Sequence, residues 1–192
     1  MSSVMKAYLA ASQARPSTVQ FATGAVVMAV GDAFTQAAVE RRQTPDVKRN
    51  ATAAVFNGGV SPVLYWWYGL LDRTWPGSTL RMLAPKLLCN QIISSTTLSP
   101  AFVVWSAYVE AMLAGELSDA PGREQVATAL SARLQTEFAR IVGSSFCVWL
   151  PANAINFVFV PPHLRIAFMS TVACGWGGFL SYIAHRELDE KG

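Results

Sequence analysis

Charged residues are scarce in this sequence. They make up 14% of the 192 residues, whereas apolar residues make up 52%. Soluble domains carry about 25% charged residues, so this chain lacks the material for an ordinary water-exposed surface. The 15 basic and 12 acidic residues nearly balance, which argues against a nucleic-acid-binding protein. The sequence therefore indicates a single integral membrane domain, residues 1–192, whose main partner is the lipid bilayer.

Residues that carry catalysis or bind metals are scarce as well. The only histidines are His163 and His185, and neither has a cysteine at metal-ligand spacing. There is no phosphate-binding P-loop, dinucleotide fingerprint or nucleophile elbow. Cys89, Cys147 and Cys174 lie in apolar stretches, where we expect small buried side chains without disulfides. The sequence predicts no enzyme activity, no cofactor and no metal site.

Long gaps between charges are the clearest positive feature. Five gaps hold about 19 to 24 residues each, and a helix needs about 20 to cross the hydrocarbon core. Only helices and closed barrels satisfy their backbone groups in lipid, and the absence of period-two alternation argues against a barrel. We therefore predict an all-α polytopic transmembrane helix bundle. Its candidate spans lie near residues 17–39, 50–71, 87–109, 141–160 and 166–184.

The second half of the chain leaves two alternatives open. Pro161-Pro162 predicts a tight helical hairpin between the last two spans, because proline lacks the N–H that a helix interior requires. If the final segment packs sideways, four true spans remain. Residues 122–140 predict an amphipathic helix that runs into the fourth span. It either packs on the bundle, lies along the membrane interface, or binds a partner.

Aromatic residues with polar tips cluster at four predicted span ends. Rings of this kind gather at membrane–water interfaces, so they indicate an aromatic belt rather than a buried core. They are Trp66, Trp67, Tyr68, Trp75, Trp105, Tyr108 and Tyr182.

Polar residues inside the spans are the candidate functional residues. Asp32 is the one acid within a span, and Gln36 follows on the same helical face. Intramembrane polar groups face the bundle interior or a wet cavity, so they form either an interhelical network or a polar pathway. We expect the partner of Asp32 to be a cation at a loop end or an amide such as Gln91 or Asn153. The full set is Asp32, Gln36, Asn90, Gln91, Asn153 and Asn156.

Residues 149–165 also carry a family resemblance. The stretch resembles the signature of the Mpv17/PMP22 family, which runs Trp-Pro, Gln, Asn-Phe, Val-Pro and Arg, with the proline displaced by one position and Asn153 in place of Gln. The first span adds Gly31-Asp32 with Gln36, and Asn90 stands where the family has Asp. The structural signature residues are Trp149, Pro151, Phe157, Val160, Pro161 and Arg165.

The resemblance implies a small protein of the mitochondrial inner membrane or, alternatively, the peroxisomal membrane. The acid-poor N-terminus with Lys6 and Arg15 favours mitochondrial import. The family resembles pore-like or membrane-homeostasis proteins, so one hypothesis is a channel for small solutes or ions. The alternative is a non-catalytic accessory subunit of a larger respiratory assembly, bound to other inner-membrane subunits or to copies of itself. Asn90 weakens the pore hypothesis, since it removes an acid that a cation pathway would use.

Arg165 is expected to act at the hairpin rather than in transport. It follows the Pro161-Pro162 break directly. A basic head at a span end can reach water or cap the free carbonyls of a helix C-terminus. We therefore predict that Arg165 lies at the membrane surface and holds the fourth and fifth spans together.

Overall fold

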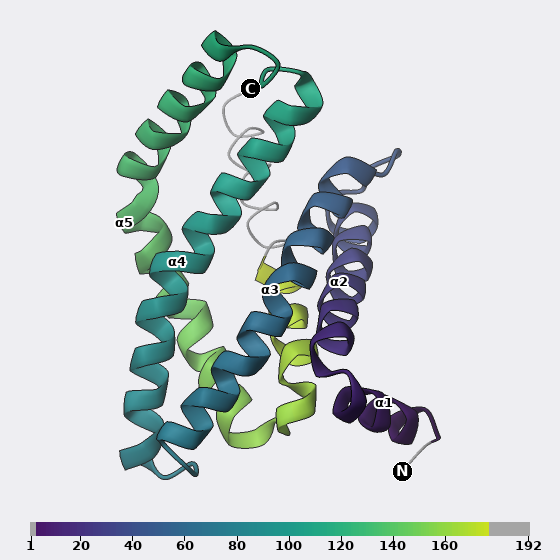
Figure 1. Cartoon of the computed structure of the whole chain (residues 1–192), viewed down its shortest axis with the longest axis vertical. Coiled ribbons are helices and arrows are strands. Elements are labelled where there is room, and N and C mark those ends of the chain that lie inside the picture. The colour runs from purple at the N-terminus through teal and green to yellow at the C-terminus, as the bar shows by residue number, and fades with distance from the viewer. Residues whose placement is uncertain (1–2, 177–192) are drawn as a thin grey trace. The chain divides into compact units, whose positions relative to one another are not determined.

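The computed structural model describes residues 3–176, without the side chains of residues 133, 137, 140 and 141. Within this range the secondary structure is helical and contains no strand, which confirms the predicted all-α class. A helix without a label in Figure 1 covers residues 165–176. The other elements are α1 (Ser3–Ala14), α2 (Pro16–Phe34), a π-helical turn (Thr35–Val39), α3 (Val47–Thr74), α4 (Leu80–Ala114), α5 (Ala120–Phe159) and a 3₁₀ turn (Pro162–Leu164).

Three of the described helical segments are long and apolar enough to cross a membrane. They are Pro16–Val39, Leu80–Ala114 and Val142–Phe159. These segments agree with the first, third and fourth predicted spans. The predicted amphipathic helix, residues 122–140, forms the first half of α5 and continues into the fourth span.

The other two predicted spans are helical where they are described. The second lies in α3, whose 28 residues are interrupted by amides, glycines and aromatic residues that lower its apolar character. The fifth is helical over residues 166–176, and its remainder, residues 177–184, lies outside the described residues.

The chain divides into two compact units, which are described separately. Unit 1 comprises Met1–Pro76 and Ile155–Gly192, and unit 2 comprises Gly77–Ala154. Unit 1 therefore holds α1, α2, α3, the end of α5 and helix 165–176. Unit 2 holds α4 and most of α5.

Close backbone packing joins the helices of unit 1. In Figure 1, α2 and α3 run antiparallel and side by side. A Cβ atom placed on Gly24 would lie 1.9 Å from the Ser61 Oγ atom, and one on Gly31 would lie 2.2 Å from the Cys174 Sγ atom. Small residues let helices approach closely where packing, rather than water exclusion, drives association. These two glycines therefore fix α3 and helix 165–176 against α2.

The hairpin after α5 follows the prediction from its prolines. The helix ends at Phe159, and the chain turns through the 3₁₀ segment Pro162–Leu164 before helix 165–176 begins. The Leu164 N–H donates to the Pro161 carbonyl at 2.9 Å. Because neither proline can donate to a preceding turn, the helix cannot continue through this point.

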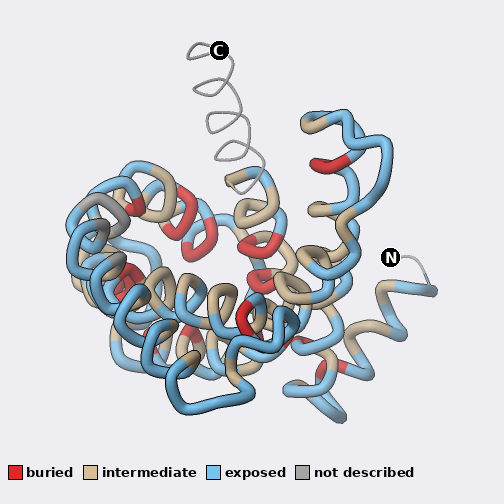
Figure 2. Tube along the Cα trace, turned by 90° about the horizontal axis from the view of Figure 1, so that it is seen from above, coloured by how far each residue is buried: buried red, intermediate tan, exposed pale blue. Residues whose placement is uncertain are grey.

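Much of the described surface is apolar. Figure 2 shows few buried residues, and the exposed ones include Val26, Val30 and Phe34 on α2. The three cysteines are free thiols. Cys147 is exposed, so the expectation of burial was wrong for this residue, and Cys89 and Cys174 are only partly buried. In a chain bounded by lipid, apolar character does not require burial within the protein.

The predicted aromatic belt holds only in part. Trp66 and Tyr108 are 52% and 53% exposed, as outward-facing belt residues should be. Tyr68 is 4% exposed and packs edge-to-face on Phe157, with ring centroids 5.3 Å apart. Assigning Tyr68 to the belt was therefore wrong, because it is a core residue of unit 1. Tyr182 lies outside the described residues.

Candidate functional site

Asp32 is held in an ion cluster where α2 and α3 meet. One of its carboxylate oxygens accepts from Arg49 Nη2 at 2.7 Å and Arg49 Nε at 3.1 Å. The other accepts from Gln36 Nε2 at 2.7 Å. Arg49 also contacts Glu40, whose side chain is 1% exposed, at 2.8 Å. The partner of Asp32 is thus a cation at a loop end, the first of the two predicted kinds, and not the Gln91 or Asn153 amide.

Gln36 ties this cluster to the loop between the two helices. Its amide oxygen accepts from the Asp46 N–H at 2.6 Å, and its Nε2 donates to the Asp46 carbonyl at 3.1 Å. Gln36 lies in the π-helical turn Thr35–Val39, whose extra residue rotates the chain that follows it relative to an ordinary α-helical turn. The Asp46 side chain in turn caps α3 by accepting from the Arg49 N–H at 3.0 Å.

The cluster as a whole is a structural clamp. Arg42 extends it by donating to Glu40 at 2.7 Å. Two arginines thereby face three carboxylates, those of Asp32, Glu40 and Asp46. Charge-assisted hydrogen bonds of this kind are stronger than neutral ones, and they involve both carboxylate oxygens of Asp32. The arrangement fixes the α2–α3 hairpin and leaves Asp32 paired.

The amides of unit 1 differ in how far they are satisfied. Asn57 donates to the Gly24 carbonyl and to the Ser170 hydroxyl, each at 2.8 Å, which links three helices. Asn156 and Gln20 are both 0% exposed. Their side-chain nitrogen and oxygen atoms have no hydrogen-bond partner within the described range. Unit 1 therefore contains both a closed polar network and two amides with unmet bonding capacity.

The predicted amides of unit 2 are equally buried. Gln91 is 1% exposed and donates to the Ser145 hydroxyl at 3.3 Å, while Asn90, at 0%, accepts from Ser94 at 3.5 Å. Asn153 donates to the Trp149 carbonyl at 2.7 Å. Gln91 thus links α4 to α5 in the manner of interhelical glue, whereas Asn153 bonds within its own helix.

Arg165 is the best-connected residue of the C-terminal signature. Its guanidinium pairs with the Asp72 carboxylate, and its Nε donates to the Val160 carbonyl at 3.3 Å. The guanidinium carbon lies 5.0 Å from the centre of the Phe157 ring, a cation–π distance. The residue is 6% exposed. Of the two predicted alternatives, the structure has the cap on the end of α5, and the head also turns inward to Asp72.

The other signature residues shape the backbone around this point. Phe157 supplies the ring face, while Val160 and Pro161 form the end of α5 and the start of the turn. Trp149 and Pro151 lie about two to three turns before the end of α5, where Trp149 supplies the carbonyl that Asn153 binds. The last four signature residues therefore lie around the end of α5 and the turn that follows it.

Sequence reasoning missed the partners of these residues. Arg49, Glu40 and Asp72 lie just outside the ends of the predicted spans, in segments that the sequence assigns to loops. Lys86, at 1% exposure, was also counted as a span boundary, although it donates to the Gly77 carbonyl at 3.3 Å. A signal was available for Arg49, since an intramembrane acid requires a cation within reach of its helix end.

These features define a helical integral membrane protein. Residues 124–181 match the model of the Mpv17 / PMP22 family. The mitochondrial inner membrane protein Mpv17 of Homo sapiens is 31% identical over 184 residues, which cover 94% of this chain and 97% of that protein. The Bos taurus protein of the same name is 33% identical over the same shares of both chains. Protein sym-1 of Neurospora crassa is 26% identical, covering 92% of this chain and 96% of its own.

The chain belongs to the Mpv17/PMP22 family. The names of the relatives confirm the mitochondrial inner membrane over the peroxisomal alternative. No solved structure matches the chain.

Proposed function

We propose that this inner-membrane protein is a non-catalytic structural subunit of a larger assembly. One observation carries the proposal. Of the six residues predicted to line a pathway, five are at most 2% exposed, namely Gln36, Asn90, Gln91, Asn153 and Asn156. A side chain that lines an open aqueous lumen is accessible to water, and these are not. The sixth, Asp32, is neutralised by Arg49.

The exposed apolar surface supports the same proposal. Val26, Val30 and Phe34 are 60%, 66% and 67% exposed along α2. Lipid or the helices of other subunits can cover such a face, and helix association in membranes relies on surfaces of this kind. Other inner-membrane subunits, or further copies of the chain, are the partners that we propose.

A channel is the second candidate, and the amides of Asn156 and Gln20 favour it. Leaving a buried polar group without a partner costs about 1–3 kcal/mol. A rearrangement that hydrates these two amides would recover that cost and open a polar route through unit 1. In this alternative the described structure is a closed state.

Reconstitution distinguishes the two candidates. We expect the purified protein to add no conductance to a planar bilayer. We also expect it to copurify with partner subunits in a fixed ratio when it is extracted in mild detergent. Asp32→Asn should then be silent in transport, whereas Asp32→Leu should lower the melting temperature by removing acceptors from Arg49 and Gln36. Asp119→Asn, outside the predicted spans, is the matched control. If the protein conducts ions, and Asp32→Asn shifts the ion selectivity without changing the melting temperature, the channel hypothesis is supported instead.

We further propose five transmembrane spans, with α3 and helix 165–176 as the second and part of the fifth. The 28 residues of α3 extend about 42 Å at 1.5 Å per residue, enough to cross the hydrocarbon core. An odd number of spans places the two termini on opposite sides. With a tag at each end, a membrane-impermeant reagent applied to mitoplasts should label one terminus only. Equal labelling of both would reduce the number to four.

A further inference from the structure

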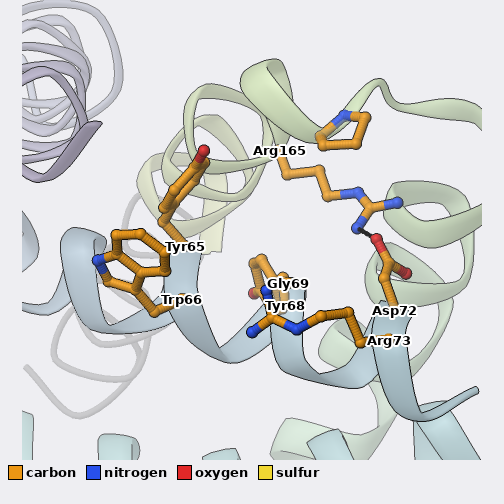
Figure 3. A pocket seen from close by; sticks show the side chains of 8 residues that line it. Tyr65, Trp66, Tyr68, Gly69, Asp72, Arg73 and Arg165 are labelled. Carbon is orange, nitrogen blue, oxygen red and sulfur yellow. Dashed lines mark hydrogen bonds and ion pairs between the residues drawn. The ribbon is translucent and has the colours of Figure 1, made fainter. Parts of the chain in front are cut away.

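A small pocket with a mixed polar and apolar lining lies at the C-terminal end of α3, outside the predicted polar pathway. It has a volume of about 110 Å³ and is closed on one side by the start of the C-terminal hairpin. Its lining combines aromatic, basic and acidic side chains, several of which Figure 3 shows as sticks. The residues that line it are Tyr65, Trp66, Tyr68, Gly69, Asp72, Arg73, Pro162 and Arg165.

Two arginines give the pocket an excess of positive charge. Asp72 balances Arg165, which leaves the charge of Arg73 uncompensated within the pocket. No hydrogen-bond or ion-pair partner of Arg73 is found among residues 3–176. Figure 3 shows its side chain lying back along α3 towards Gly69, and a Cβ on Gly69 would stand 4.0 Å from Arg73 Nη1. Arg73 is therefore an exposed cation without a protein partner among the described residues, beside an acid that is already paired.

Two further donors of the pocket have no protein acceptor among the described residues. Tyr68 is 4% exposed, yet its hydroxyl has no hydrogen-bond partner in the described part of the chain. Arg165 uses its Nε and Nη1 atoms for Val160 and Asp72, and its Nη2 has no protein acceptor within that part. A hydroxyl and two guanidinium groups thus line a space whose one carboxylate, that of Asp72, already pairs with Arg165. Each hydroxyl or guanidinium N–H donates readily to an anion.

We propose that this pocket binds a phosphate group, and that the phosphate belongs to the headgroup of an anionic phospholipid. Arginine is well suited to phosphate because its planar fork matches the oxygens of the anion. At 110 Å³ the pocket is smaller than the roughly 300 Å³ at which sites for whole small molecules begin. It can therefore hold the phosphate of a headgroup while the rest of the lipid stays outside the pocket.

The location of the pocket favours a lipid as the source of the phosphate. Tyr65 and Trp66 stack edge-to-face beside it, with centroids 5.4 Å apart, and Trp66 is 52% exposed. Tryptophan at the end of a span marks the level of the headgroups. Basic pockets between transmembrane helices bind the headgroups of anionic lipids. A phospholipid would be held by its phosphate, while Trp66 contacts the start of its acyl region.

Two variants test the pocket by independent means. Arg73→Gln removes the unpaired cation, and Gly69→Leu fills the space without a clash at its Cβ. Matched controls are Arg81→Gln, an exposed arginine outside the pocket, and Gly59→Leu, an α3 glycine with no atom within 4 Å of its Cβ position. The full-length protein, in nanodiscs of phosphatidylcholine with or without phosphatidylglycerol, is assayed by native mass spectrometry and thermal melting. Inorganic phosphate without anionic lipid forms a separate arm.

We expect phosphatidylglycerol to remain bound and to raise the melting temperature of the parent protein and both controls. Arg73→Gln should weaken that binding about tenfold, as expected for loss of one charged hydrogen-bond donor, and Gly69→Leu should abolish it. Stabilisation by inorganic phosphate alone, lost in the same two variants, would keep the phosphate site and assign it to a soluble ligand. Binding of neither probe, or an equal loss in the two controls, would overturn the proposal. Lipid binding and melting temperature are measured separately from copurification and conductance, which test the proposed function. Failure of the lipid site can therefore be distinguished from failure of the proposed function.

Discussion

Arg165→Ala is expected to lower the free energy of unfolding by about 3 kcal/mol and to reduce the yield of folded protein. Removing one partner of a buried ion pair costs about 3–5 kcal/mol. The lower end applies because the Asp72 side chain is 30% exposed. The substitution also removes the cap on Val160 and the contact with the Phe157 ring. Thermal and denaturant unfolding in detergent micelles measures the loss.

The conservative variant separates charge from geometry. Arg165→Lys keeps the charge near Asp72, but a single ammonium cannot make the three contacts of a planar guanidinium, so intermediate stability is expected. Asp72→Asn and the double variant Asp72→Asn/Arg165→Gln complete a cycle. Its coupling energy should be clearly positive, as for residues in direct contact. If Arg165→Ala melts like the parent protein, Arg165 does not hold the hairpin.

Two substitutions of the same kind are expected to have opposite effects in unit 1. Gly24→Ala should destabilise the protein by about 1–3 kcal/mol, the usual cost of overpacking. The new Cβ would meet Ser61 Oγ at 1.9 Å and the Asn57 backbone oxygen at 3.0 Å, so α2 and α3 must separate. Gly59→Ala meets nothing within 4 Å and should stabilise α3 by up to about 1 kcal/mol through helix propensity.

A second substitution tests whether the contact with Ser61 causes the destabilisation expected for Gly24→Ala. Ser61→Gly removes both Ser61 atoms that crowd position 24, so Gly24→Ala/Ser61→Gly should lose less stability than the sum of its two single variants. Full additivity would show that α2 and α3 do not meet at this point. Melting curves of the four proteins in one detergent make the comparison direct.

The charge-free gaps predicted the helices because the cost of charge in lipid acts on every residue of a span. That rule located α2, α4 and the second half of α5, and the prolines located the hairpin. It could not identify ion pairs, because pairing depends on which helix ends meet. Arg165 and Asp72 are 93 residues apart in sequence, and Arg49 and Asp32 are 17 apart. In both pairs, at least one residue stands at the edge of a gap, where a charge looks like part of a loop.

Helix periodicity explains the error over Tyr68. Residues two positions apart point about 200° away from each other around a helix with 3.6 residues per turn. With Trp66 facing outward at 52% exposure, Tyr68 must face inward, and it is 4% exposed. A cluster of adjacent aromatic residues therefore cannot lie wholly in an interfacial belt. The spacing of Trp66 and Tyr68 in the sequence indicates that they face opposite sides of the helix, but a prediction from residue type alone ignores this spacing.

The widened turn at Thr35–Val39 makes this part of the chain sensitive to changes in length. Deleting one residue there would restore an ordinary α-helical turn and rotate all that follows by about 100° relative to α2. Gln36 would then no longer face Asp46, and Arg49 would lose its approach to Asp32. Loops between helices commonly tolerate insertions and deletions. Evolutionary drift in length should therefore be found elsewhere, such as in the segment between α4 and α5, rather than at the junction of α2 and α3.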